Sequence, residues 1–284
     1  MKGAWKYLAV LILVGCDRPA KHAVQVKVPS GGTVEIVQSD AASGKIIDLT
    51  HTFDEKTIYW PTENGFQFQR GNNGITAKGY YYAANRFTTA EHGGTHLDAP
   101  IHFAADHQTA AEVDLDRLMG EGAVIDVSDK CAADSDYLIG IADLHAWEQR
   151  TSRRLNDVIV LLKTGWSRHW PDRKKYLGTD ARGPDAIAAL RFPGLSVEAA
   201  KWLVTERKPK SIGIDTASID RGRSTHFESH RVLCEHNVPI FENVASLDEV
   251  PTTGAKIIAL PMKIAGGSGG PLRIVAVLGK GAGE

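Results

Sequence analysis

The sequence has little cysteine and no excess of charge of either sign. Of its 284 residues, three are cysteines, and 33 basic residues stand against 34 acidic ones. Cys131 and Cys234, the two that follow Cys16, are too few for a disulfide framework, and the sequence leaves open whether they pair. Balanced charge, together with the lack of a basic run or a known nucleic-acid motif, argues against nucleic acid as a partner.

The sequence also lacks an apolar run long enough to span a bilayer, which takes about twenty residues. The nearest is residues 7–14, which follow Lys2 and Lys6. The next letters, LVGC at 13–16, resemble a bacterial lipobox, whose cysteine is lipidated and becomes the new N-terminus. We therefore predict a lipoprotein signal peptide with lipidation at Cys16; the alternative is a buried helix at a cytoplasmic N-terminus.

This start defines the expected layout of the chain. Residues 1–16 are predicted to be the signal peptide, 17–45 a polar tether and N-terminal extension, and 46–280 a single folded domain. The lipid would be the only membrane contact and would hold the protein at the bacterial cell envelope, on the periplasmic face. Asp17 resembles the signal that retains some lipoproteins at the inner membrane.

Histidine is concentrated in one short segment. The stretch EHGGTHLDAPIHF at 91–103 holds His92, His96, Asp98 and His102. Imidazole nitrogens and carboxylate oxygens are the usual ligands of a catalytic divalent ion. The paired glycines and the proline disfavour a helix, so we expect the cluster on an irregular segment between strands. The competing interpretation is a histidine run with only a structural role at the surface.

Short apolar, β-rich runs alternate with amphipathic helices, which predicts an α/β fold with a mixed central sheet. We expect helices over 141–150, 196–207 and 227–237, the last ending where Asn237 can adopt the left-handed cap conformation. The expected strands lie in 45–50, 80–89, 122–128, 157–165, 211–217, 238–244, 256–264 and 273–279.

The stretch from His92 to His102 resembles the H-x-G-T-H-x-D-x-P-x-H signature of the cyclase family, and every signature position is filled. Known members include bacterial kynurenine formamidases and isatin hydrolases. A second segment, SHRVLCEHNVPIFENV, carries His230 and Glu242 in the arrangement that the family uses for its remaining metal ligands, and GIDTASID is also similar. The resemblance covers roughly residues 46–280 and implies a single domain with the swivelling β/β/α architecture.

The resemblance implies a site with one or two divalent ions, zinc or alternatively manganese, in which Asp98 could bridge two ions. The apolar neighbours of Glu242 support its role, because a carboxylate is rarely buried in such a run without a cation. Cys234 lies one helical turn after His230 and is expected to be a core residue. The implied metal ligands are His92, His96, Asp98, His230 and Glu242.

His102 matches the family's catalytic histidine, which can take a proton from the attacking water and return it to the leaving amine. Trp60, Phe66 and Phe68 precede the motif where the family places apolar residues near its substrate; core or dimer packing is their alternative role. The implied protein is a homodimer or higher homo-oligomer.

The implied activity is hydrolysis of a C–N amide bond in a small molecule, either an arylformamide or a cyclic amide, by metal-activated water. Two alternatives remain. One is a lyase or dehydratase that uses the same metal and His102, and the other is a metal-binding lipoprotein without catalysis. The intact His102 argues against the second, because a pure binder needs ligands but no proton shuttle.

Overall fold

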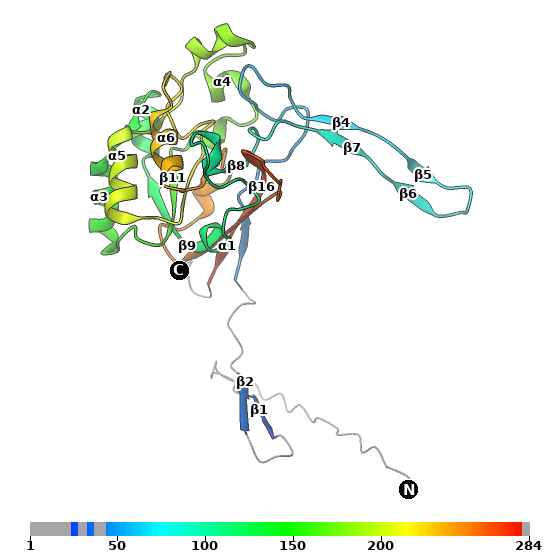
Figure 1. The fold of residues 1–284 in the computed structure, drawn as a ribbon, viewed down its shortest axis with the longest axis horizontal. Helices are drawn as coiled ribbons and strands as arrows, with labels where there is room; N and C mark the ends of the chain where they lie inside the picture. The colour runs from blue at the N-terminus through cyan, green and yellow to red at the C-terminus, as the bar shows by residue number, and fades with distance from the viewer. Residues whose placement is uncertain (1–23, 28–32, 37–43, 280–284) are drawn as a thin grey trace. The chain divides into compact units, whose positions relative to one another are not determined.

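The computed structural model describes residues 24–27, 33–36 and 44–279, within two units that span 1–43 and 44–284 (Figure 1). In the first unit, β1 (Val24–Lys27) pairs antiparallel with β2 (Thr33–Ile36), so the predicted polar tether contains two short strands. The predicted signal peptide and Cys16 lie outside the described residues. Within those residues, no helix combines the length and the apolar character that a membrane crossing requires.

The second unit is built on one eight-stranded mixed sheet. Its strands are β3 (Ile46–Asp48), β8 (His96–Asp98), β9 (Met119–Asp126), β11 (Ile159–Lys163), β13 (Ser211–Ile214), β14 (Ile240–Glu242), β15 (Ala255–Pro261) and β16 (Gly269–Leu278). They follow the order β15-β9-β11-β13-β14-β8-β16-β3, and β15 also pairs with β16. The sheet therefore closes into a barrel with β3 outside the ring, which confirms the predicted mixed sheet.

The barrel separates two apolar cores. Since side chains alternate across a strand, neighbouring residues of β9 and β11 belong to different cores. Val124 and Leu161 pack in the barrel interior, whereas Ile125 and Val160 pack under the helices. This two-sided burial explains why the central strands read as continuous apolar runs.

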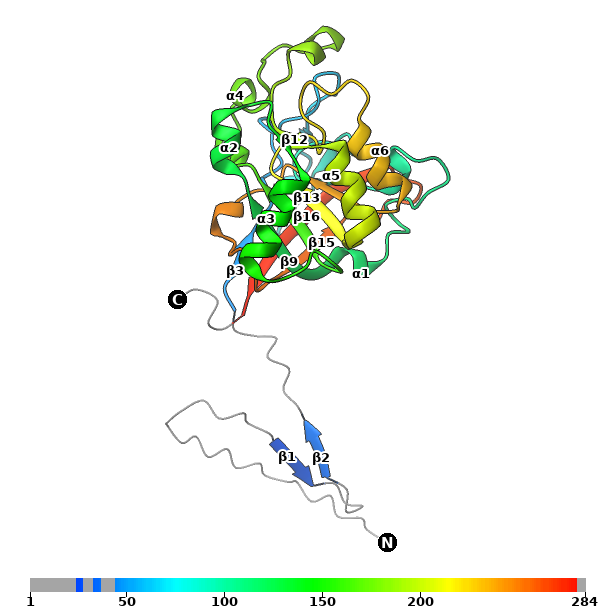
Figure 2. The ribbon, with the colours of Figure 1, turned by 90° about the vertical axis from the view of Figure 1, so that its left-hand side faces the viewer.

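Three helices cover the outer face of the parallel strands β9, β11 and β13 (Figure 2). They are α3 (Ile141–Thr151), α5 (Val197–Trp202) and α6 (Glu228–Glu235). The helix predicted over 196–207 is composite, because α5 continues into the π-helical turn η4 (Leu203–Arg207). Asn237 follows α6 with a φ of 52°, as predicted.

Shorter elements connect these layers. They are α1 (Leu115–Leu118), α2 (Ser128–Ala133), α4 (Arg173–Leu177), η1 (Pro100–His102), η2 (Trp166–His169), η3 (Pro184–Ala189), η5 (Leu247–Glu249), β10 (Leu138–Ile139) and β12 (Gly194–Leu195).

Cys131 and Cys234 are both free and buried in the core under the helices, and burial raises the pKa of each thiol to about 12. The expectation that Cys234 is a core residue is confirmed.

An arm, residues 67–88, extends away from the barrel (Figure 1). In it β4 (Gln67–Gln69) pairs with β7 (Arg86–Thr88), and β5 (Asn73–Ile75) pairs with β6 (Tyr81–Ala83), both antiparallel. The run 80–89 is therefore split between two strands that do not join the central sheet. An isolated two-stranded hairpin is only marginally stable in water, so packing against another surface would stabilise the arm.

Candidate metal centre

Two regions far apart in the sequence, residues 92–102 and 230–242, meet at the barrel strand β8. His96 and Asp98 are the first and last residues of β8, and Glu242 on the antiparallel neighbour β14 lies in register with His96. His230 comes from α6. These four residues are at most 4% exposed, which is unusual for ionisable residues that are not paired or bound to a cation.

The glycines of the motif allow the turn that leads into β8. Gly93 and Gly94 have φ values of 149° and 58°, in the region that favours glycine. A Cβ atom on Gly93 would come within 2.1 Å of the Tyr59 ring, and one on Gly94 within 2.6 Å of Phe53. The chain can therefore pass close to both rings and bring His92 back onto Asp98.

Asp98 is the centre of the cluster. Its Oδ1 lies 2.6 Å from His92 Nδ1 and 3.1 Å from His96 Nε2, and its Oδ2 lies 3.2 Å from His230 Nε2. Glu242 approaches the same nitrogens, with Oε1 3.1 Å from His230 Nε2 and Oε2 3.6 Å from His96 Nε2. Within residues 44–279, neither carboxylate has a lysine or arginine partner.

The other ring nitrogen of each of the three histidines has a hydrogen-bond partner. His96 Nδ1 donates to the Gly94 carbonyl at 2.9 Å, and His230 Nδ1 donates to Asp220 Oδ2 at 2.7 Å. His92 Nε2 lies 2.9 Å from Ser268 Oγ, and that hydroxyl donates to Glu91 at 2.6 Å, so His92 Nε2 is the donor. In the neutral tautomers, the lone pairs therefore face the buried carboxylates, which is how metal-ligating histidines are oriented.

The electrostatics of the cluster favour a cation between these groups. Burial raises the pKa of Glu242, and the neighbouring charge of Asp98 raises it further. Burial lowers the pKa of His230, but hydrogen bonds with Asp220, Asp98 and Glu242 outweigh burial and raise that pKa well above its ordinary value. Asp98 and Glu242 thus attract positive charge to the space between them and the imidazole lone pairs. The residues present therefore fit a divalent ion.

His102 lies against the cluster at the end of η1. Its ring stacks on His92 with centroids 3.8 Å apart, and the His230 ring lies 5.9 Å away. Burial lowers the pKa of His102 to about 3, so the imidazole is neutral at pH 7. Ligand atoms lie within 4.8 Å of one another in two overlapping groups, His92 with His96 and Asp98, and Asp98 with His102 and His230. His102 therefore lies close enough to the cluster for proton transfer or for metal ligation, and its low pKa makes it a weak proton acceptor while no substrate is bound.

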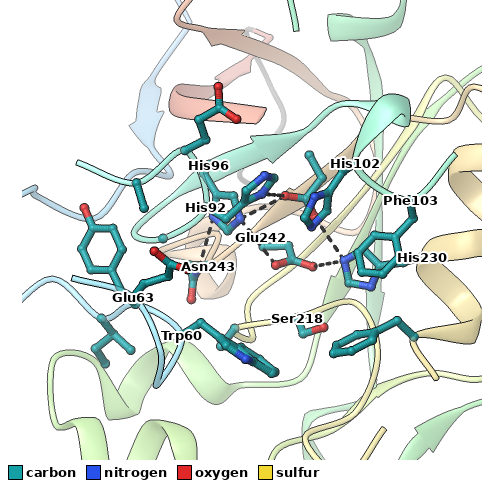
Figure 3. A pocket seen from close by; sticks show the side chains of 18 residues that line it. Trp60, Glu63, His92, His96, His102, Phe103, Ser218, His230, Glu242 and Asn243 are labelled. Carbon is teal, nitrogen blue, oxygen red and sulfur yellow. Dashed lines mark hydrogen bonds and ion pairs between the residues drawn. The ribbon is translucent and has the colours of Figure 1, made fainter. Parts of the chain in front are cut away.

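A cavity of about 370 Å³ opens over the cluster (Figure 3). Its walls are mainly apolar, and aromatic side chains of Tyr59, Trp60, Phe103 and Phe227 contribute to them. A cavity of this size and lining suits a small aromatic ligand.

Only one of the three residues that we expected at the substrate lines the cavity. Trp60 lines the cavity, whereas Phe66 and Phe68 are not among its lining residues. Phe66 packs against Phe53 and Phe87, with ring centroids 5.9 and 5.6 Å apart, and Phe68 on the arm is 52% exposed. Phe66 therefore packs within this chain, as its alternative role predicts, whereas Phe68 remains half-exposed on the arm.

The partners that orient the histidines were not predicted from the sequence. Asp220 closes the GIDTASID segment and accepts from the backbone N–H groups of Ser229 and His230, which ties that segment to the start of α6. Glu91 directly precedes the histidine motif, and this position was its only sequence signal. Ser268 lies in a glycine-rich turn and has no local signal, because its contact with His92 spans 176 residues.

Comparisons with known proteins agree with this geometry. The family description "Putative cyclase" matches residues 47–221. An isatin hydrolase from Roseibium aggregatum is 30% identical over 210 residues, which cover 71% of this chain and 77% of that protein. A kynurenine formamidase from Erythrobacter litoralis is 29% identical over 231 residues, covering 81% and 93%. The solved structure of isatin hydrolase A from Ralstonia solanacearum superposes with a TM-score of 0.74 at 30% identity, covering 82% of this chain and 92% of that one, which confirms the predicted fold. The chain belongs to the cyclase family.

Proposed function

We propose that this protein is a metal-dependent hydrolase that cleaves a C–N amide bond in a small aromatic formamide or cyclic amide. One observation carries the proposal. His92, His96 and His230 are each hydrogen-bonded through one ring nitrogen and direct the other ring nitrogen at the buried carboxylates of Asp98 and Glu242. Relatives named isatin hydrolase and kynurenine formamidase support the bond type. The aromatic wall beside the cluster supports a flat substrate.

The proposed ligands are His92, His96, Asp98, His230 and Glu242. Two possible ligand groups share Asp98, but the second contains His102, which the proposed reaction uses as the proton shuttle, so the residues support one or two ions. Zinc is favoured over manganese by the general order of affinities. A bound divalent ion lowers the pKa of water and polarises the amide carbonyl.

In the proposed reaction, this chain's residues position the amide and move one proton. Trp60 and Phe103 hold the aromatic ring and exclude water from the apolar side of the cavity. As water adds to the carbonyl carbon, neutral His102 accepts a proton from it, and returns that proton to the nitrogen as the C–N bond breaks. A linear formamide gives formic acid and an amine, whereas a cyclic amide gives one ring-opened product that carries both groups.

Elemental analysis and a substrate panel test the proposal. We expect one or two divalent ions per chain after metal supplementation, and turnover of an aryl formamide or of isatin. In ¹⁸O-labelled water, hydrolysis places solvent oxygen in the carboxylate product, whereas a lyase or dehydratase does not. Lack of stoichiometric metal, or product without the label, would contradict the assignment.

The envelope location and the oligomeric state are further parts of this proposal. The LVGC sequence at 13–16 supports a lipid anchor on Cys16.

The arm supports a homodimer or larger assembly, because its large apolar side chains Ile75 and Tyr81 are 72% and 61% exposed. Residues 67–88 also contain three basic residues and no acidic one, whereas the rest of 44–279 has an excess of acidic residues. A second copy of this chain would therefore attract the arm.

A further inference from the structure

The cavity over the metal centre carries one carboxylate that the proposed reaction does not use. No lysine or arginine lines this cavity, and its acidic residues are Glu63, Glu91, Asp98 and Glu242. Asp98 and Glu242 belong to the cluster. Glu91 accepts hydrogen bonds from Ser268. The Glu63 side chain, by contrast, forms no hydrogen bond or ion pair within residues 44–279.

Glu63 is held in place by its backbone. Its N–H donates to the Trp60 carbonyl at 3.0 Å, and the Pro61 carbonyl accepts from Gly183 N at 2.9 Å, so this turn is tied to the body of the domain. Trp60 itself packs against Phe192 and Phe227, with centroids 6.5 and 6.1 Å apart. The Glu63 side chain is exposed, beside Trp60 and across the view of Figure 3 from His230.

We propose that Glu63 is a specificity-determining residue that favours aromatic amides carrying an ammonium group over those carrying a carboxylate. The inference rests on the proposed function and names the substrate class of the same site. A carboxylate on the rim of an apolar cavity attracts a cation, because the low-dielectric wall screens the charge less than bulk water does. The neighbouring Trp60 ring adds a surface on which an ammonium group is also stabilised. An anionic substituent that lies beside Glu63, across the cavity from His230, would meet a like charge, and no lysine or arginine lines the cavity to offset it.

Three aryl formamides that share one ring and differ only in an aminoethyl, hydroxyethyl or carboxyethyl substituent test this role. We expect the metal-loaded full-length protein to show a kcat/KM roughly three- to tenfold higher for the ammonium compound than for the neutral one, because Glu63 is exposed. Added salt should reduce this preference. In Glu63→Gln, the preference for the ammonium compound over the neutral one should disappear, and turnover of the carboxylate compound relative to the neutral one should rise.

Glu55→Gln is the matched control, because it removes the same charge from an exposed position that does not line the cavity. An equal effect of Glu63→Gln on all three compounds, or an effect matched by Glu55→Gln, would overturn the proposal. Turnover of the neutral formamide tests the proposed function separately. If the wild type turns over none of the three, calorimetric binding of the corresponding anilines to both variants still decides whether Glu63 recognises the ammonium group.

Discussion

His92, His96 and His230 each have one ring nitrogen hydrogen-bonded to a supporting group and the other beside the buried carboxylates. Support comes from a backbone carbonyl for His96, from Asp220 for His230 and from Ser268 for His92. His102 differs, since its ring stacks on His92 and its side chain has no hydrogen-bond partner within residues 44–279. The lack of a hydrogen-bond partner suits a group that must exchange protons with a substrate. Substitutions of His96 and His102 are therefore expected to have different effects on metal content.

His96→Ala is expected to lower metal content and activity together, because a ligand is lost. His102→Ala should keep the metal and the fold but lose about 10²–10⁴-fold in turnover, the contribution of one general acid–base group. Substrates with a better leaving group should lose less. Metal content and turnover of both variants decide between the roles: metal loss in His102→Ala would make His102 a ligand, and near-normal turnover would exclude it as the proton shuttle.

Between elements, a buried ion pair joins α3 to the π-helical turn that follows α5. Arg207 donates from Nε and Nη2 to the two carboxylate oxygens of Glu148, at 2.7 and 3.0 Å, and the N–H of Leu155 donates to Oε1 at 3.0 Å. The Arg207 guanidinium also lies 4.1 Å from the centre of the Trp202 ring. Burial raises the pKa of Glu148, but the Arg207 and Leu155 hydrogen bonds outweigh burial and lower that pKa below its ordinary 4.5.

Glu148→Gln is expected to reduce the free energy of unfolding by about 3–5 kcal/mol at pH 7, because it leaves the buried Arg207 unpaired. Since the pKa of Glu148 is lowered on folding, its stabilisation is present above pH 4.5 and declines as the pH falls through the folded-state pKa. Denaturant unfolding of wild type and variant from pH 7 to pH 3 should show the difference shrinking below pH 4.5. A difference that does not depend on pH would contradict the role of the Glu148 charge.

The exposed pair Lys45–Glu249 provides the control for that experiment. Its side chains are 64% and 53% exposed, so Glu249→Gln should change stability by about 1 kcal/mol or less. If Glu249→Gln reduced the free energy of unfolding as much as Glu148→Gln does, burial of the ion pair would not explain the loss of stability.

At the scale of the whole molecule, the arm is expected to mediate self-association. Ile75→Ser with Tyr81→Ser should weaken it by about 2 kcal/mol or more, roughly 30-fold in Kd, because large anchors carry most interface energy. Sedimentation over a range of concentrations measures this shift. Leu115→Ser is the control, since Leu115 is 60% exposed but lies outside the arm. A wild type that stays monomeric, or an equal effect of the control, would remove the arm from this role.

The predicted lipid anchor also concerns the whole molecule. Cys16→Ser should leave the protein unprocessed or soluble instead of membrane-bound, because this cysteine is the predicted site of lipid attachment. Cell fractionation combined with metabolic lipid labelling measures both consequences. If the wild type takes up no label and the variant still fractionates with membranes, residues 1–16 are not a lipoprotein signal peptide.

Local chemistry in the sequence was enough to predict the mixed α/β fold, the positions of most barrel strands and the cluster from His92 to His102, whereas His230 and Glu242 were implied by the resemblance to the cyclase family. Two-sided burial leaves continuous apolar runs, which are readable along the chain. The glycines and the proline predicted an irregular segment for the whole cluster, and this was wrong for His96–Asp98, which form β8 through pairing with β14 and β16. Only the tertiary structure decided that the sheet closes through β15 and β16, and that 80–89 lies in an arm outside the barrel. It also brought Ser268 to His92 and left Phe66 and Phe68 out of the cavity lining. These outcomes depend on pairing between residues far apart in the chain, and an apolar run has the same composition whether a barrel or another surface buries it.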